Sequence, residues 1–236
     1  MCIRDRLTTG TGSIFAFLVA RQAYGTALLA PMFIIMSFAW GLAVFMVVQK
    51  AMFGWSGLVL HRTIRHRLKN LLGIFISAVF YFVAVYHLSN IYFARQYEFE
   101  RFILLEGGIF PALFWGGWLL IGTLIPLAIL YLRPLSSIRG SVMTASLLVI
   151  VGAFCLLYVF IIGGQAFPLE IFPGYAIKSS FFDGVVDHYT PTLPETLLAF
   201  GGLGIAFTIT TIGVRALHFM PQDDIAQLEA AGSITD

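Results

Sequence analysis

The stretch that decides the fold runs from Val85 to Leu132 and reads VYHLSNIYFARQYEFERFILLEGGIFPALFWGGWLLIGTLIPLAILYL. It contains the end of one apolar helix, a short connector rich in charge, and a second apolar helix rich in Gly and Trp. His87 is the only histidine inside an apolar span, and Glu106 stands where the chain becomes apolar again. If the two helices are antiparallel neighbours, both side chains lie near the same membrane face.

Composition places the whole chain in a membrane. Of the 236 residues, 59% are hydrophobic and 11% are charged, and the mean hydropathy is +0.89. So few charged residues cannot cover a soluble domain. The net charge of +2 is too small to indicate nucleic acid as a partner. Two cysteines, Cys2 and Cys155, allow no cysteine-based metal site, so we expect no iron–sulfur cluster in this chain.

Apolar runs of about 20 residues or more predict membrane-crossing helices. The sequence contains five, and we expect an all-α integral membrane bundle with spans at about residues 25–48, 71–93, 107–132, 141–163 and 194–217. We interpret residues 1–22 as an N-terminal scar followed by an interfacial segment (Ser13 to Tyr24), residues 23–218 as the transmembrane domain and residues 219–236 as a short cytoplasmic tail. The piece from Ala51 to Leu60 is too short to span, and we expect it to lie along the interface.

The distribution of basic residues predicts the orientation. The loops after the first and third spans contain no acid but several basic residues: Lys50, Arg62, Arg65, Arg67, Lys69, Arg133 and Arg139. The other two loops are acidic on balance. By the positive-inside rule, the basic loops and the C-terminus face the cytoplasm. His87, Glu106 and the loop from Gly164 to Leu193 then face the opposite, periplasmic side, although Arg4, Arg6 and Arg21 disagree with an outside N-terminus.

The loop from Gly164 to Leu193 is rich in Gly, Pro and aromatic residues, and we expect it to fold back over the outer mouth of the bundle. It closes with TLPE, which matches a capping box. In this interpretation Thr192 caps the fifth helix and Glu195 reaches back to it.

Three stretches together resemble a known family: YHLSNIY, then PALFWGGWLLIGTLIPLAILY, then GGQAFPLEIFPGY followed by YTPTLPE. They are similar to the membrane subunit of the NrfD or polysulfide reductase (PsrC-like) family, and most similar to the DsrP-type subunit of sulfur-metabolising Dsr complexes. The resemblance covers about residues 13–221. The family usually has eight to ten spans, so the resemblance implies that this chain is the C-terminal part of a longer subunit.

The resemblance also implies a function. Members of the family are haem-free helical bundles of the bacterial inner membrane that exchange electrons between a quinone pool, menaquinone or ubiquinone, and extrinsic partners. The implied partners are a ferredoxin-like iron–sulfur subunit on the periplasmic side and a cytochrome c, in sulfur-compound respiration or oxidation. The family's best-associated quinone contacts lie in the N-terminal bundle, and none maps onto a position of this chain.

Quinone turnover requires an apolar slot, a hydrogen-bonding group at each quinone oxygen and a proton route to water. His87 is a candidate for one oxygen because imidazole titrates near neutral pH, and Glu106 is a candidate to pass the proton outward. Tyr86, Asn90 and Tyr92 on the same helix end are further candidate quinone contacts, with Asn90 on the face of His87. Equally, His87 can be an interfacial residue, and Glu106 can complement the dipole of the third helix.

Three other functions remain to be weighed. A b-type cytochrome requires two histidines at matched depth, and His61, His66, His188 and His218 all lie in loops or at helix ends. A secondary transporter is the runner-up, but no Asp, Glu, Lys or Arg falls in the core of any of the five spans. A purely structural membrane anchor differs from the quinone-interacting subunit only in whether a quinol binds. The sequence therefore leaves open whether the chain is itself catalytic.

Overall fold

The computed structural model describes residues 3–18, 23–55, 62–132, 140–168 and 191–216. Every regular element in these ranges is a helix. The long spans are α2 (Leu29–Trp55), α3 (Arg62–Tyr92), a third that joins α5 (Ile109–Ala112), η2 (Leu113–Leu124) and α6 (Ile125–Tyr131), and a fourth that joins α8 (Ser141–Tyr158), η3 (Val159–Gly163) and α9 (Gly164–Ala166). Here η denotes a π-helical segment.

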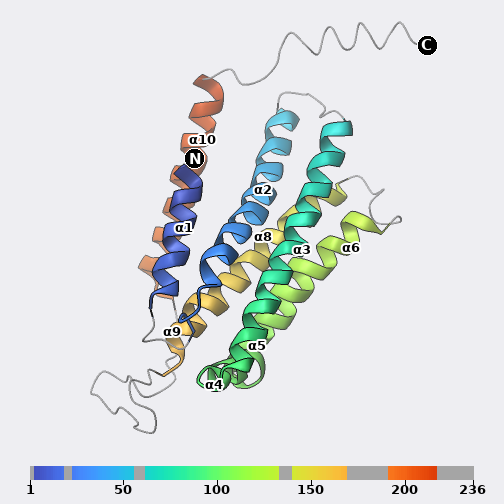
Figure 1. The fold of residues 1–236 in the computed structure, drawn as a ribbon. Helices are drawn as coiled ribbons and strands as arrows, with labels where there is room; N and C mark the ends of the chain where they lie inside the picture. Colours follow the sequence, from blue (N-terminus) through green and yellow to red (C-terminus); the bar gives the residue numbers. More distant parts are fainter. Residues whose placement is uncertain (1–2, 19–22, 56–61, 133–139, 169–190, 217–236) are drawn as a thin grey trace, which may run out of the picture. The chain divides into compact units, whose positions relative to one another are not determined.

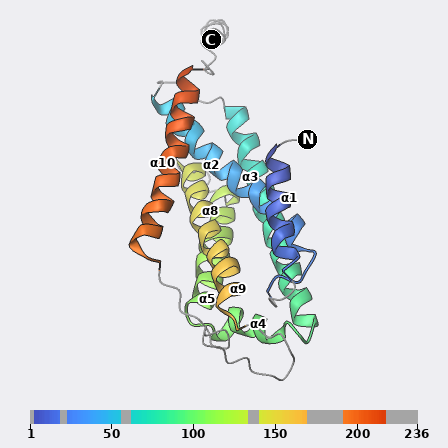
Figure 2. The same ribbon diagram turned by 90° about the vertical axis from the view of Figure 1, so that its left-hand side faces the viewer.

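These four spans form a closed bundle in which each packs against two others (Figure 1). The neighbours are α2 with α3, α3 with α6 and η2, η2 and α6 with α8, and α8 with α2. The amino-terminal helix α1 (Ile3–Ala16) packs along α2. Two short elements, α4 (Tyr97–Arg101) and η1 (Phe102–Glu106), connect α3 to the third span at the end of the bundle marked by α4 and α5 in Figure 2.

The fifth long helix, α10 (Leu193–Ala216), belongs to a separate compact unit. At its start, the Thr192 backbone N–H donates to Oε2 of Glu195 at 2.9 Å, which is the Glu195 half of the predicted capping box. Five helices in the described residues are therefore long and apolar enough to cross a membrane, as the sequence predicted: Leu29–Gly54, Thr63–Tyr92, Ile109–Tyr131, Ser141–Ala166 and Leu193–Gly213.

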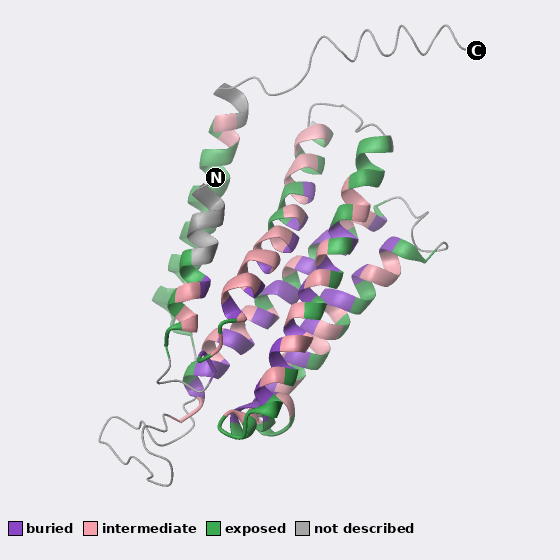
Figure 3. Ribbon diagram, viewed as in Figure 1, coloured by how far each residue is buried: buried purple, intermediate pink, exposed green. Residues whose placement is uncertain are grey.

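Buried and exposed positions alternate along the helices of the bundle (Figure 3), and large apolar side chains occur at both. Met32, Met36 and Val83 are fully buried in one cluster of the core, whereas Phe45 and Phe154 are largely exposed. Apolar residues on both faces of a helix are typical of a bundle surrounded by lipid. The exposed apolar side chains thus fit the membrane environment that the composition predicted.

Close approach between the third and fourth spans depends on glycine. A Cβ atom added to Gly122 would lie 2.6 Å from Cα of Gly152, and one added to Gly117 would lie 2.6 Å from Sγ of Cys155. Small residues of this kind allow membrane helices to pack backbone against backbone. Pro126 follows at the second position of α6, directly after the twelve-residue π-helical segment η2. Proline lacks the N–H that a regular helix would use there.

Several predicted boundaries differ from the structure. The first span begins at Leu29, not at residue 25, and α2 continues to Trp55, so residues 51–55 extend the helix instead of forming an interfacial piece. The second span begins at Arg62, so part of the predicted basic loop is helical. Hydropathy places the limits where the chain becomes polar, but a helix continues beyond the hydrocarbon because Lys and Arg side chains reach the headgroup region.

The segment predicted to lie along the interface, Ser13 to Tyr24, is helical only as far as Ala16, where α1 ends. Ala23 and Tyr24 instead lie in the bundle core, at 2% and 3% exposure. The predicted outer loop ran from Gly164 to Leu193, but Gly164–Ala166 form α9 at the end of the fourth span. Residues 169–190 of that loop and the tail at 219–236 lie outside the described residues, and so do His61, His188 and His218.

Candidate functional site

The candidate site lies where α3 ends and the chain turns into α4. The Gln96 N–H donates to the Phe93 carbonyl at 2.9 Å, and the Glu100 N–H donates to the Gln96 carbonyl at 3.0 Å, which starts the short helix. The turn folds α4 back against α3. Phe99 and Glu100 are consequently buried, at 2% and 1% exposure.

Glu100 binds two side chains of α3. Its Oε2 lies 2.6 Å from Nδ1 of His87, and its Oε1 accepts a hydrogen bond of 2.7 Å from Nδ2 of Asn90. His87 and Asn90 are themselves 7% and 1% exposed. Buried charges are stable in proteins only when they are paired and hydrogen-bonded. The three residues therefore form one buried polar unit, which we call the His87–Asn90–Glu100 cluster.

Aromatic rings enclose the imidazole of His87. The Phe114 ring of η2 lies edge-on with its centroid 4.8 Å away, and the Phe160 ring of η3 lies at 6.0 Å in a stacked orientation. Nε2 of His87 is buried and has no hydrogen-bond partner among the described residues. A buried polar nitrogen without a partner is uncommon. It indicates a group whose partner, such as a ligand or a water molecule, lies outside the protein chain.

Two tyrosines next to the cluster already bind backbone carbonyls. The Tyr86 hydroxyl donates to the Ala23 carbonyl at 2.6 Å. The Tyr24 hydroxyl lies 3.0 Å from the carbonyl oxygens of both Phe160 and Ile161 and donates toward them. These bonds attach the segment before α2 to α3 and to η3, so they hold the walls of the site in place.

The structure brings together some of the predicted site residues and separates others. His87 and Asn90 share the same partner, which confirms that they lie on one face of α3. Tyr86 is buried beside them with its hydroxyl engaged, whereas Tyr92 is 85% exposed. Glu106 does not join the cluster. Its Oε1 pairs with Nη2 of Arg101 at 2.6 Å, and its side chain is 57% exposed.

Sequence reasoning missed Glu100, the residue that holds the cluster together. Phe99, Glu100 and Ile103 are buried, while Glu98 and Arg101 between them are exposed. Positions that are three and four residues apart share a helical face, as Glu100 and Phe99 do with Ile103. The apolar residues at 99 and 103 were therefore the available signal that position 100 turns inward.

The exposed side of the same corner is held by a surface ion pair and a tryptophan. Glu106, by its hydrogen bond and its charge, raises the pKa of the Arg101 guanidinium above the usual range of arginine. Nε1 of the half-exposed Trp115 donates to the Leu104 carbonyl at 3.0 Å. Trp118, by contrast, is buried and packs against Phe114.

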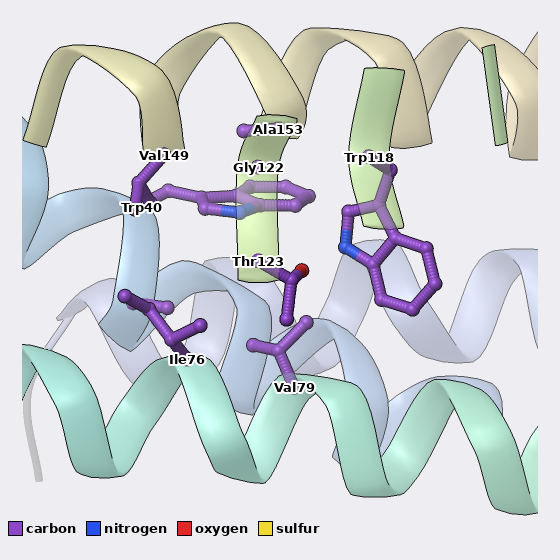
Figure 4. Close-up of a pocket in the computed structure, with 9 residues that line it drawn as sticks. Trp40, Ile76, Val79, Trp118, Gly122, Thr123, Val149 and Ala153 are labelled. Carbon is purple, nitrogen blue, oxygen red and sulfur yellow. The ribbon is translucent and has the colours of Figure 1, made fainter. Parts of the chain in front are cut away.

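A small cavity lies deeper in the bundle, between α2, α3, η2 and α8 (Figure 4). Thr123 supplies a hydroxyl to a lining that is otherwise apolar apart from the indole nitrogens of Trp40 and Trp118. The free space is about 10 Å³, which is roughly enough for the centre of one water molecule. The cavity is too small for a quinone ring, so it is a packing gap or a water site and not a site for such a ligand.

The His87–Asn90–Glu100 cluster is suited to proton exchange. Imidazole changes its charge near neutral pH, and a carboxylate on one ring nitrogen determines what the other nitrogen does. Within the cluster, Nε2 of His87 is the buried atom without a hydrogen-bond partner in the described residues. An apolar bundle of long helices, with this buried histidine–carboxylate pair at one end, defines a multi-pass membrane protein.

Comparison with known proteins agrees with that class. The family described as Polysulphide reductase, NrfD matches residues 6–169, and the chain belongs to this family of integral membrane proteins. It is 28% identical over 224 residues to the Hdr-like menaquinol oxidoreductase integral membrane subunit of Archaeoglobus fulgidus, covering 93% of this chain and 56% of that protein. It is also 28% identical over 219 residues to a protein of Halobacterium salinarum provisionally described as a membrane subunit of dimethyl sulfoxide reductase, covering 88% of this chain and 49% of that protein.

The chain thus spans about half the length of the curated relatives that it matches. No solved structure matches it.

Proposed function

We propose that this chain is part of a quinone-interacting membrane subunit of an oxidoreductase complex, and that His87 exchanges the proton of the quinone. The observation that carries the proposal is the buried, unpartnered Nε2 of His87 in the His87–Asn90–Glu100 cluster. Membership of the NrfD family and the name of the Archaeoglobus relative, a menaquinol oxidoreductase subunit, support a quinone as the substrate. Menaquinol is therefore the first substrate to test.

Among the predicted quinone contacts, His87 has the group best placed to act. Tyr86 and Asn90 already donate hydrogen bonds within the protein, and Tyr92 points away from the cluster's buried surroundings. A general base or acid must carry its proton at the reacting oxygen, and an imidazole nitrogen can do so in either direction. Tyr86 and Asn90 then hold the site in place. The proposed contact between Tyr92 and the quinone can form only on the exposed surface at the end of α3.

The electrons of the reaction go to extrinsic partners of the complex. Oxidation of one quinol releases two electrons and two protons. In this proposal the electrons pass to iron–sulfur or haem centres of partner subunits, a ferredoxin-like protein or a cytochrome c, on the periplasmic side of the cytoplasmic (inner) membrane. A DsrP-like role in sulfur-compound metabolism remains part of the proposal, as does the cytoplasmic C-terminus. A reporter fused to the C-terminus, active only in the cytoplasm, tests that orientation.

The direct test measures menaquinol-dependent reduction of the partner centres in the full-length protein and its complex. His87→Ala should lower turnover by a factor of about 10² to 10⁴, the usual contribution of a general base or acid. His66→Ala is the matched control, because His66 lies on the same helix but is exposed and bonded only to Asn70. Its turnover should equal that of the wild type.

The outcomes for two variants decide the two parts of the proposal. Loss of turnover in His87→Ala with the complex intact supports the proposal. Wild-type turnover in that variant would leave a structural anchor, or a quinone site elsewhere in the full-length subunit. Glu106→Gln is measured in the same assay, since passage of the proton outward through Glu106 is still a prediction. A slowed proton release in that variant supports it, and wild-type release overturns it.

A further inference from the structure

We propose that Glu100 is the positioning residue that decides whether His87 accepts or donates a proton. This inference rests on the proposed function of His87 and goes beyond it, because it assigns a role to a carboxylate on the connector after α3. The inference starts from the two short hydrogen bonds of Glu100, to Nδ1 of His87 and to Nδ2 of Asn90.

The Asn90 bond determines which carboxylate oxygen can hold a proton. Its amide N–H can only donate, so Oε1 of Glu100 must be an acceptor. Any proton shared by the pair therefore lies between Oε2 and Nδ1 of His87, which are 2.6 Å apart. At that separation, one of the two atoms must donate and the other must accept.

Two arrangements follow, and they differ by one proton. When Glu100 is ionised and His87 is neutral, Nδ1 of His87 carries the ring proton and Nε2 has a free lone pair. When Nε2 has gained a proton, the proton between Nδ1 and Oε2 can lie on either atom, and Nε2 is a donor in both cases. Uptake of one proton at Nε2 therefore converts it from an acceptor into a donor, while Glu100 keeps the other ring proton at Nδ1. The carboxylate of a hydrolase triad selects the histidine tautomer in the same way.

The ionised form is the one that accepts a proton from quinol. In that step the O–H bond of one quinol hydroxyl breaks and an N–H bond forms at Nε2 of His87. The second hydroxyl proton goes to water, and the two electrons go to the one-electron centres of the partner subunits. The cluster starts with a net charge of −1 and ends as a neutral ion pair. This change is favourable in a buried site, where an uncompensated charge is poorly stabilised.

Other titratable groups around the cluster do not compete for this role. The Tyr86 and Tyr24 hydroxyls donate to backbone carbonyls, and the rings that reach His87 from η2 and η3 are phenylalanines. On α4, Glu98 is exposed, and Arg101 pairs with Glu106 on the surface. Glu100 is therefore the charged group in direct contact with the imidazole in the described part of the chain.

Glu100→Gln inverts the hydrogen-bonding pattern without changing the size of the side chain. The amide oxygen accepts the bond from Asn90, so the amide N–H₂ faces Nδ1 of His87 and donates to it. Nε2 must then carry the proton in the neutral ring and cannot accept another from quinol. Glu98→Gln is the matched control, because it makes the same substitution on an exposed position of the same short helix. Glu100→Asp keeps a carboxylate and serves as the conservative variant.

The experiment measures the pH profile of menaquinol oxidation by the full-length complex, normalised to the amount of assembled complex. In the wild type, the rate should rise with pH as the cluster loses its proton. Glu100→Gln should lower kcat about 10²-fold and displace or abolish this rise. Glu100→Asp should restore part of the rate together with the rise, and Glu98→Gln should match the wild type. A uniform loss in Glu100→Gln with an unchanged profile would show a merely structural role and overturn the inference.

Redox-difference infrared spectroscopy keeps the inference testable if Glu100→Gln is inactive. Binding of menaquinol should change the protonation of the histidine–carboxylate pair in the wild type and in Glu98→Gln, and the signal should be absent in Glu100→Gln. Its persistence in Glu100→Gln would overturn the inference. Wild-type turnover in His87→Ala would reject the proposed role of His87, and the role of Glu100 with it. If turnover is lost in His87→Ala but the pH profile of Glu100→Gln equals that of the wild type, only the role of Glu100 is rejected.

Discussion

Replacing Gly122 by alanine should weaken the packing between the third span and α8. The new methyl group would lie 2.6 Å from Cα of Gly152 and 3.3 Å from its carbonyl carbon. Carbon atoms in contact normally lie about 3.5–4.0 Å apart, so the two helices must separate by roughly 1 Å at their crossing. Because the obstructing atoms belong to the backbone, no side chain can rotate away. We expect an overpacking cost of about 1–3 kcal/mol.

Gly116 provides the matched control for this prediction. It lies in the same segment, η2, but a methyl group there would meet no atom within 4 Å. Both variants gain the same helical preference of alanine over glycine, about 1 kcal/mol. The difference in unfolding free energy between Gly122→Ala and Gly116→Ala therefore isolates the cost of the contact.

The assay is equilibrium unfolding of the purified full-length protein in detergent micelles, titrated with a denaturing detergent and followed by tryptophan fluorescence. Gly122→Ala should unfold at a lower denaturant concentration than the wild type, and Gly116→Ala at the same or a higher one. If the two variants unfold together, the backbone contact at Gly122 does not limit the packing of these spans, and the reasoning fails.

Three further variants test other contacts. Tyr24→Phe leaves two carbonyls of η3 without their hydroxyl donor and should lower the unfolding free energy by about 1–3 kcal/mol, whereas the exposed Tyr81→Phe should have no effect in the same titration. Arg101→Gln removes an exposed ion pair and should not change stability measurably. The raised pKa of Arg101 gives stability that is lost only as pH rises through that pKa, so its unfolding curves and those of the wild type should stay parallel between about pH 5 and 9. Glu195→Ala should speed amide hydrogen exchange in the first turn of α10, because the Thr192 N–H loses its partner; unchanged exchange would contradict the capping box.

The helices could be predicted from the sequence because hydropathy over about 20 residues is a local property. The capping box at Thr192 and Glu195 was predictable for the same reason, since both partners lie within one turn. The shared face of His87 and Asn90 followed from their spacing of three residues. Each of these predictions needed only the geometry of one element.

The carboxylate partner of His87 could not be predicted in that way. Glu106 was selected because it stands at the start of an apolar run, but the chain forms α4 and η1 before it reaches that point. The turn at Phe93 to Gln96 sends Glu100 inward and leaves Glu106 on the surface with Arg101. The turn determines which of the acids in a short connector becomes buried. Five residues are too few to show a clear periodicity of apolar and polar side chains.

Placing the carboxylate on a connector also explains why the spans contain no acid in their cores. A carboxylate in the middle of the hydrocarbon is strongly unfavourable unless it is paired. Glu100 lies at the end of the bundle, where α4 covers it and α3 supplies two polar partners from one face. The site thus has a buried charge without interrupting the apolar surface of any span.

Two π-helical segments, η2 and η3, complete this arrangement, since both contribute to the walls around His87. A regular α-helix turns about 100° per residue, so each residue added by a wider turn rotates the side chains that follow it. Phe114 near the start of η2 and Phe160 in η3 are the rings that contact the imidazole. In η3 the carbonyls of Phe160 and Ile161 also receive the Tyr24 hydroxyl, which anchors the widened turn to the segment before α2. Because each of these contacts joins elements far apart in the sequence, the surroundings of His87 exist only in the folded bundle.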